Sequence, residues 1–197
     1  MSPARGRTSA DAIVAAGREL LEAGGLEKVT MQAIAGRVGV RAPSLYKRFP
    51  SRGALVATMI GDILGEIRDH LEPPDDADPA VEIRRLAARY RAYALAHPRA
   101  YALAFTDLPP DHRPSAEANA RASAPLIELA GRLVGPEHAL EAARLLTAFA
   151  HGFVSMELGG AFRLGGDVDA AFAFGVDVII GALEAPPFGS GEATPGD

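Results

Sequence analysis

Residues 30–56 read TMQAIAGRVGVRAPSLYKRFPSRGALV, and this stretch decides the fold. Its opening threonine is a good N-cap for a short helix with apolar residues at helical spacing, and Gly39 permits a tight turn after that helix. A second short helix is expected over Ala42–Arg48, because Pro43 is tolerated in a first helical turn and Pro50 stops the helix. Two short helices joined by a tight turn are typical of a helix-turn-helix.

The flanking sequence predicts one helix on each side of this stretch. The first helix begins near Ser9 or Asp11 and ends at the glycine pair 24–25, because glycine accepts the left-handed conformation at a helix C-terminus. A long helix begins at Ser51, and its apolar residues recur at every fourth position: Leu55, Met59, Ile63, Ile67 and Leu71. Residues 1–52 are therefore expected to form a three-helix helix-turn-helix head.

The rest of the chain also reads as helices, which makes the fold class all-α. Residues 72–79, EPPDDADP, read as an exposed linker, and residues 108–114 as a loop. Helices are expected over Ala80–His97, from there to Phe105, and over 115–134, 137–158 and 168–185. Residues 53–185 would thus form a helical-bundle body. The tail at 186–197 is rich in Gly, Pro, Ser and Thr and is expected to be disordered.

Charge is distributed unevenly between head and body. The chain of 197 residues has a formal net charge of −5, yet residues 1–52 hold nine Lys and Arg against four Asp and Glu. Residues 53–197 hold 11 Lys and Arg against 21 Asp and Glu. A basic head on an acidic body is typical of a DNA-binding module joined to a sensor, because only the head must face phosphates.

The second short helix has the side chains that reading DNA requires. Arg41 and Lys47 can reach base acceptors or phosphates in the major groove. Three small residues allow the N-terminal end of this helix to approach the groove: Ala42, Pro43 and Ser44. The N-terminus of the long helix can hold a phosphate through its free N–H groups, with Ser51 and Arg52 beside them.

The order of these residues resembles the TetR family of bacterial regulators. The family pattern I-A-x-x-x-G-V, L-Y-x-x-F, P-S/N-K/R and A-L is matched here by Ile34–Ala35, Gly39–Val40, Leu45–Tyr46, Phe49, Ser51–Arg52 and Ala54–Leu55. The resemblance implies that Thr30, Tyr46 and Arg52 contact phosphates. It also implies a group that faces bases or the adjoining backbone: Arg41, Ala42, Ser44 and Lys47. Two heads of a dimer would read a pseudo-palindromic operator in double-stranded DNA.

Two residues depart from the family pattern. Pro43 stands where the family often has glycine or another small residue. Gly53 replaces a commoner Glu or Asp and is expected to loosen the first turn of the long helix. Outside the pattern, Arg5 and Arg7 either form an arm that reaches the minor groove or remain solvated.

In the body, residues 145–162 resemble the C-terminal domain of a TetR subset with a Trp-His-Gly signature. His151 and Gly152 fit that signature, whereas the chain has no tryptophan. The resemblance implies a homodimer through the helices near 137–158 and 168–185, packed as a four-helix bundle. The last helix is apolar nearly all round and needs cover on more than one side. Three glycines would allow close helix approach: Gly152, Gly175 and Gly181.

A pocket for a small-molecule effector is expected among the middle helices. Its candidate walls are aromatic, with one histidine as a polar contact: Tyr90, Tyr93, Tyr101, Phe105, Phe149 and His151. Aromatic residues at helical spacing also serve as ordinary core packing, so this alternative stays open. The few polar groups favour an apolar or aromatic effector.

Two functions follow from these features. The first is a ligand-responsive regulator, in particular a repressor released from its operator by a small molecule, and the intact set of Thr30, Tyr46, Lys47 and Arg52 favours it. The second is a helical small-molecule carrier or enzyme whose head no longer binds DNA. The sequence holds no Walker A, GxGxxG, HExxH or GxSxG motif and no cysteine, so no catalytic residue, metal or cofactor is predicted. The lack of a secretory signal or membrane span predicts a cytoplasmic protein.

Overall fold

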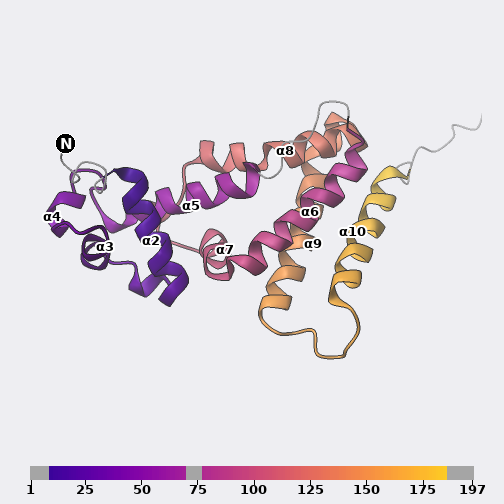
Figure 1. The fold of residues 1–197 in the computed structure, drawn as a ribbon. Coiled ribbons are helices and arrows are strands. Elements are labelled where there is room, and N and C mark those ends of the chain that lie inside the picture. Colours follow the sequence, from indigo (N-terminus) through magenta and orange to yellow (C-terminus); the bar gives the residue numbers. More distant parts are fainter. Residues whose placement is uncertain (1–8, 70–76, 186–197) are drawn as a thin grey trace, which may run out of the picture. The chain divides into compact units, whose positions relative to one another are not determined.

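The computed structural model describes residues 9–69 and 77–185, and within them the chain forms helices and no strand (Figure 1). This confirms the all-α class. Several predicted features lie outside the described residues: the arm at Arg5 and Arg7, most of the linker 72–79, Leu71 and the tail 186–197. The chain divides into two compact units, residues 1–71 with 92–123 and residues 72–91 with 124–197. Helices α6 (Pro79–Ala96) and α8 (Ala116–Val134) each contribute residues to both units.

The first unit begins with α2 (Ala10–Gly24), η1 (Leu26–Lys28), α3 (Met31–Val38) and α4 (Ala42–Leu45). The Oγ of Ser9 accepts a hydrogen bond from the N–H of Ala12, and the Oγ1 of Thr30 accepts one from the N–H of Ala33, both at 3.1 Å. Gly39 closes α3 at φ 74°, in the left-handed region that favours glycine. The N-cap predicted at Thr30 and the glycine turn are therefore confirmed, and of the two candidates for the first helix Ser9 is the N-cap.

Helix α4 is shorter than the sequence indicated. It ends at Leu45 instead of Arg48, and residues 46–48 form a turn. The N–H groups of Arg48 and Phe49 both donate to the carbonyl oxygen of Leu45, at 2.9 and 3.0 Å. The reason is Pro50, which has no N–H to donate and disfavours the helical conformation in the residue before it.

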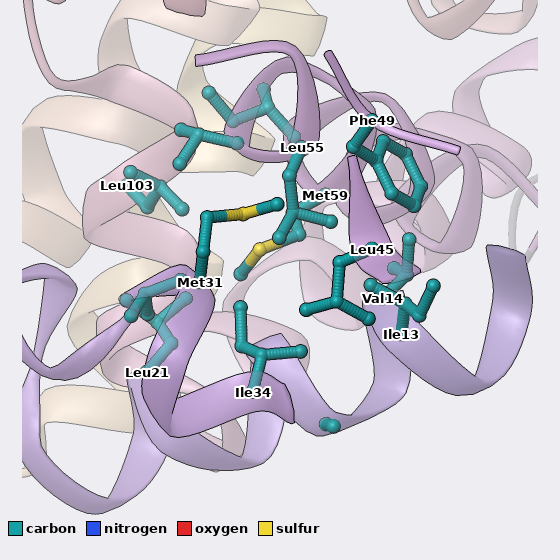
Figure 2. Packing of buried hydrophobic residues seen from close by; sticks show 14 of the residues in the cluster. Ile13, Val14, Leu21, Met31, Ile34, Leu45, Phe49, Leu55, Met59 and Leu103 are labelled. Carbon is teal, nitrogen blue, oxygen red and sulfur yellow. The ribbon is translucent and has the colours of Figure 1, made fainter. Parts of the chain in front are cut away.

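The long helix α5 (Arg52–Asp69) completes the core of the first unit together with α7 (Pro98–Phe105). Figure 2 shows side chains of α2, α3, α4 and α5 converging on one apolar cluster, with Leu103 of α7 among them. The predicted four-residue spacing along α5 is confirmed at Leu55, Met59 and Ile63, none of which is exposed. Burial of these side chains stabilises the unit by roughly 1.5–3 kcal/mol for each one.

The second unit contains η3 (Pro136–His138), α9 (Ala139–Leu158) and α10 (Val168–Glu184), and α9 and α10 lie side by side (Figure 1). A Cβ atom on Gly175 would stand 2.2 Å from Cζ of Phe149. Glycine therefore lets the α10 backbone approach this ring, as the sequence predicted for Gly175. The ring of Phe149 also stacks on Phe172, with 5.8 Å between the centroids.

Arg91 joins α6 to both α9 and α10 within the second unit. Its guanidinium donates to both carboxylate oxygens of Glu157 at 2.7 and 2.6 Å, and to Oδ1 of Asp169 at 2.7 Å. Its Cζ lies 5.3 Å from the centroid of the Phe172 ring. The hydrogen bonds to Glu157 hold the pKa of Arg91 above its ordinary value. Because the side chains of Arg91 and Glu157 are only 12% and 18% exposed, little water screens their attraction.

Candidate nucleic-acid interface

The residues predicted to contact DNA within the helix-turn-helix lie at the N-terminal ends of α3, α4 and α5 and in the turn that follows α4. Most of them are exposed: Thr30, Arg41, Pro43, Tyr46, Lys47 and Ser51. The other three are half-buried: Ala42, Ser44 and Arg52. Within the same short segment Leu45 and Phe49 are buried, as the sequence predicted, whereas half of Tyr46 is exposed. The segment 41–49 therefore anchors itself by its apolar residues and leaves its polar and basic ones accessible.

Arg52 ties two of these helix starts together. Its Nε donates to the carbonyl oxygen of Val29 at 2.6 Å, and its Nη2 donates to that of Leu26 at 2.7 Å. Val29 directly precedes Thr30, the N-cap of α3, and Arg52 is the first residue of α5. The guanidinium thus holds the N-terminus of α5 next to the N-terminus of α3.

Both helix starts are capped by hydroxyl groups that keep a proton to donate. The Oγ1 of Thr30 accepts from the N–H of Ala33 at 3.1 Å, and the Oγ of Ser51 accepts from the N–H of Ala54 at 3.0 Å. A hydroxyl that accepts one hydrogen bond can still donate its own hydrogen to an anion. Helix N-termini add a partial positive charge, so this pair of capped ends is suited to phosphate groups.

Gly53 has a different role from the loosened turn expected of it. It is buried, and the space that a side chain would need is filled by Asp111 and His112 of η2 (Pro110–His112). Glycine at this position lets η2 pack directly on the first turn of α5. The sequence gives no local signal for this contact, because the partners are 58 and 59 positions away.

A polar network that the sequence does not predict joins α2, α5 and α6. Arg18 donates to both carboxylate oxygens of Glu66, with Nη2 to Oε2 at 2.6 Å, and the Tyr93 hydroxyl donates to Oε2 at 3.1 Å. The hydrogen bond from Arg18 holds the pKa of Glu66 below its ordinary value. Burial, followed by the charge of Glu66, raises the pKa of Tyr93. Partners this far apart in the chain leave no periodic pattern to detect.

The six predicted pocket residues are divided between the units. Tyr93, Tyr101 and Phe105 belong to the first unit, where Tyr101 is buried with its ring centroid 5.0 Å from that of Phe105. The second unit holds the other three: Tyr90, Phe149 and His151. Partial burial lowers the pKa of His151.

A cavity of about 410 Å³ in the first unit is lined by other residues. They come from α5 and α8: Gly61, Asp62, Gly65, Glu66, Arg68, Ala118, Arg121 and Ala122. Among the described residues, His, Asp and Glu form no cluster of three or more that could hold a metal ion. None of the described helices is both long and apolar enough to cross a membrane.

Two family models match the chain and together cover most of both units. Residues 13–59 match the model described as bacterial regulatory proteins, tetR family. Residues 83–179 match the model described as Tetracyclin repressor-like, C-terminal domain. The first match contains every residue predicted to contact DNA within the helix-turn-helix, and the second contains every predicted pocket residue.

Individual proteins are similar over the same span. An uncharacterized HTH-type transcriptional regulator of Mycobacterium tuberculosis is 30% identical over 181 residues, covering 88% of this chain and 79% of that protein. The class C tetracycline repressor of Escherichia coli is 31% identical over 87 residues, covering 44% of this chain and 40% of the repressor. A TetR structure from Acinetobacter baumannii AYE, solved in complex with minocycline, superposes with a TM-score of 0.68 at 26% identity. That superposition covers 88% of this chain and 95% of the other.

Proposed function

Because the chain belongs to the TetR family, whose members are ligand-responsive DNA-binding transcriptional repressors, we propose that it binds an operator and leaves it when a small molecule binds. In this proposal residues 1–52 read DNA, and residues 53–185 sense the ligand and dimerise. Such a ligand acts by binding the DNA-free conformation more tightly than the DNA-bound one. The protein works in the cytoplasm, where its DNA target lies.

The observation that carries the DNA-binding proposal is the link that Arg52 makes between the capped starts of α3 and α5. Thr30 and Ser51 offer hydroxyl groups at these two starts, and Tyr46 and Lys47 are exposed on the segment between them. Hydroxyl, ammonium and backbone N–H groups are the donors that proteins use on phosphate oxygens. Arg41 and the small residues after it would then face the major groove, at the start of α4.

The homodimer of this proposal forms through α9 and α10. Large apolar side chains of these two helices remain exposed: Leu140, Leu145, Met156, Leu158, Phe174 and Val178. A Cβ atom added to Gly152 or Gly181 would meet nothing within 4 Å among the described residues, so a second backbone can approach there. Pairing these faces across a two-fold axis removes them from water in a four-helix bundle.

The test is a fluorescence-anisotropy titration of the full chain with DNA that flanks its own gene, beside unrelated DNA, at two salt concentrations. We expect tight binding to the flanking DNA, with affinity falling steeply as salt rises. Lys47→Gln should weaken binding and reduce the salt slope by about 1. The control Arg163→Gln removes the same charge from an exposed position between α9 and α10, outside both helices, and should leave the titration unchanged.

Equal and weak binding to all DNA tested, including a genomic fragment library, would reject the repressor function. The alternative, a small-molecule carrier or enzyme with a helix-turn-helix head that no longer binds DNA, would then stand.

A further inference from the structure

Charged side chains line the cavity between α5 and α8, and one of them has no hydrogen bond or ion pair within residues 9–69 and 77–185. Four charged side chains line this cavity: Asp62, Glu66, Arg68 and Arg121. Arg121 is paired with Glu117 at 2.7 Å, Glu66 is paired with Arg18, and Arg68 also has a partner. Asp62 makes no hydrogen bond or ion pair among the described residues. Asp62 is an exposed residue, so its carboxylate is open to a group bound in the cavity.

Asp62 and Glu66 are one helical turn apart on α5 and both line the cavity. Residues at positions i and i+4 of a helix are neighbours on its surface, so one bound group can reach both carboxylates. Partial burial is the main cause that raises the pKa of Asp62; the charge of Arg18 opposes it, and the charge of Glu66 adds to it. A cation bound at Asp62 would relieve this cost of holding two carboxylates together.

Glu66 has a second role, because its carboxylate also binds a helix of the head. Its carboxylate binds Arg18 of α2, and Arg18 is the more buried partner, with 22% of its side chain exposed against 42% for Glu66. Glu66 thus binds Arg18 and also belongs to the cavity wall. A group that bound Glu66 from the cavity would compete with the bond that fastens α2 to α5.

From this arrangement we infer that the cavity binds an organic cation, such as a protonated amine, amidine or guanidinium, through Asp62 and Glu66, and that this cation competes with Arg18 for Glu66. The inference rests on the proposed function, since it names the chemical class of the effector. It also departs from the apolar effector that the sequence favoured. A volume of about 410 Å³ suits a small molecule, because ligand pockets measure roughly 300–1,000 Å³.

The test is calorimetry on the full chain with three probes of one shape and different charge: benzamidine, benzamide and benzoate. We expect benzamidine to bind, and benzamide and benzoate to bind at least about tenfold more weakly, because a charged hydrogen bond is worth about that factor. Asp62→Asn should weaken benzamidine binding about tenfold. The control Glu128→Gln removes one acidic charge from the exposed side of α8, outside the cavity, and should change nothing.

The competition between the cation and Arg18 for Glu66 is tested separately, by the benzamidine affinity of an Arg18 variant. In Arg18→Gln the Glu66 carboxylate is released to the cavity, so benzamidine should bind more tightly than to the unaltered protein. An unchanged affinity in this variant would reject the competition. Benzoate binding more tightly than benzamidine, no benzamidine binding, or Asp62→Asn behaving like Glu128→Gln would reject the cation site.

Because calorimetry uses no DNA, this inference and the repressor function fail separately. A protein that binds its operator but not benzamidine keeps its function and loses this site. A protein that binds benzamidine but no DNA keeps the site and loses the repressor function.

Discussion

A methyl group on Gly53 would stand 2.4 Å from Cδ2 of His112 and 2.6 Å from Oδ2 of Asp111. Real Cβ atoms do not come this close to other heavy atoms, so any side chain at position 53 displaces the imidazole. The packing of η2 on α5 therefore depends on glycine at this position.

Gly53→Ala consequently has two opposing effects on stability. Alanine favours the helix by up to about 1 kcal/mol, whereas moving His112 costs about 1–3 kcal/mol. We expect the substitution to be at least about 1 kcal/mol more favourable in a His112→Ala background than in the unaltered chain. Urea unfolding of the four proteins in this cycle measures the difference. Gly36→Ala, where a Cβ would meet nothing within 4 Å in the part of the chain that the structure describes, should not depend on His112.

Arg52→Gln should weaken the head as well as its DNA binding. The substitution removes the donors to the carbonyl oxygens of Val29 and Leu26, which costs about 1–3 kcal/mol for the unsatisfied groups. The midpoint of urea unfolding should therefore fall together with operator affinity. Lys47→Gln provides the contrast, since Lys47 is exposed and its loss should lower affinity alone. Unchanged stability in Arg52→Gln would contradict the structural role of this side chain.

The Arg18–Glu66 pair should make stability depend on pH in the acid range. Arg18 lowers the pKa of Glu66 in the folded chain, so the folded state binds this proton less tightly than the unfolded state. The contribution is therefore complete above the ordinary value of 4.5 and is lost as the pH falls through the lower folded value. Glu66 is partly exposed, so the loss should be at most about 1 kcal/mol. In Glu66→Gln, the free energy of unfolding measured between pH 3 and 7 should lack the pH dependence that comes from this carboxylate.

Arg91→Met should destabilise the second unit more than a substitution at any exposed position of that unit. Met keeps much of the apolar stem but leaves the carboxylate of Glu157 without its bidentate partner, at a cost of about 3 kcal/mol. Adding Glu157→Gln should recover part of this loss, because no unpaired charge remains. Thermal unfolding followed by circular dichroism checks both variants. Equal melting temperatures for Arg91→Met and the double variant would contradict the prediction.

Phe174→Glu should separate the proposed dimer. The ring is 70% exposed on α10, so the charge costs little in the single chain but cannot be covered by a second apolar face. Sedimentation velocity should show monomers and operator affinity should fall. Leu164→Glu is the matched control, since Leu164 is fully exposed outside α10 and its substitution should leave the dimer intact.

The parts of the fold that the sequence predicted are those determined by neighbours in the chain. Thr30, Gly39 and Ser51 act on backbone groups within five residues, so their roles as caps and turn follow from local chemistry. The helix spacing at Leu55, Met59 and Ile63 is a local periodicity as well. The sequence also predicts that Pro50 ends the second short helix, but it predicts the end at Arg48, three residues later than the observed end at Leu45.

The parts that the sequence did not predict depend on partners far apart in the chain. Arg18 and Glu66 are 48 positions apart, and nothing in either neighbourhood distinguishes them from solvated charges. Gly53 departs from the family pattern, but its contact with His112 is not predictable, because a missing side chain does not indicate which residue fills the space. The cavity is formed by residues of α5 and α8 that are far apart in the chain, and Arg121 in its wall is paired with Glu117. The sequence alone does not predict that these residues line one cavity.

The bonds from Arg52 to Leu26 and Val29 also bear on the entropy of association. They are internal to the head, so this long side chain and the two helix starts lose their freedom when the chain folds. Ordering one such side chain at the moment of binding would cost about 0.5–1.5 kcal/mol. Because this conformational entropy is lost when the chain folds, it is not lost again when the head binds DNA. A larger part of the interaction free energy with the operator therefore contributes to affinity.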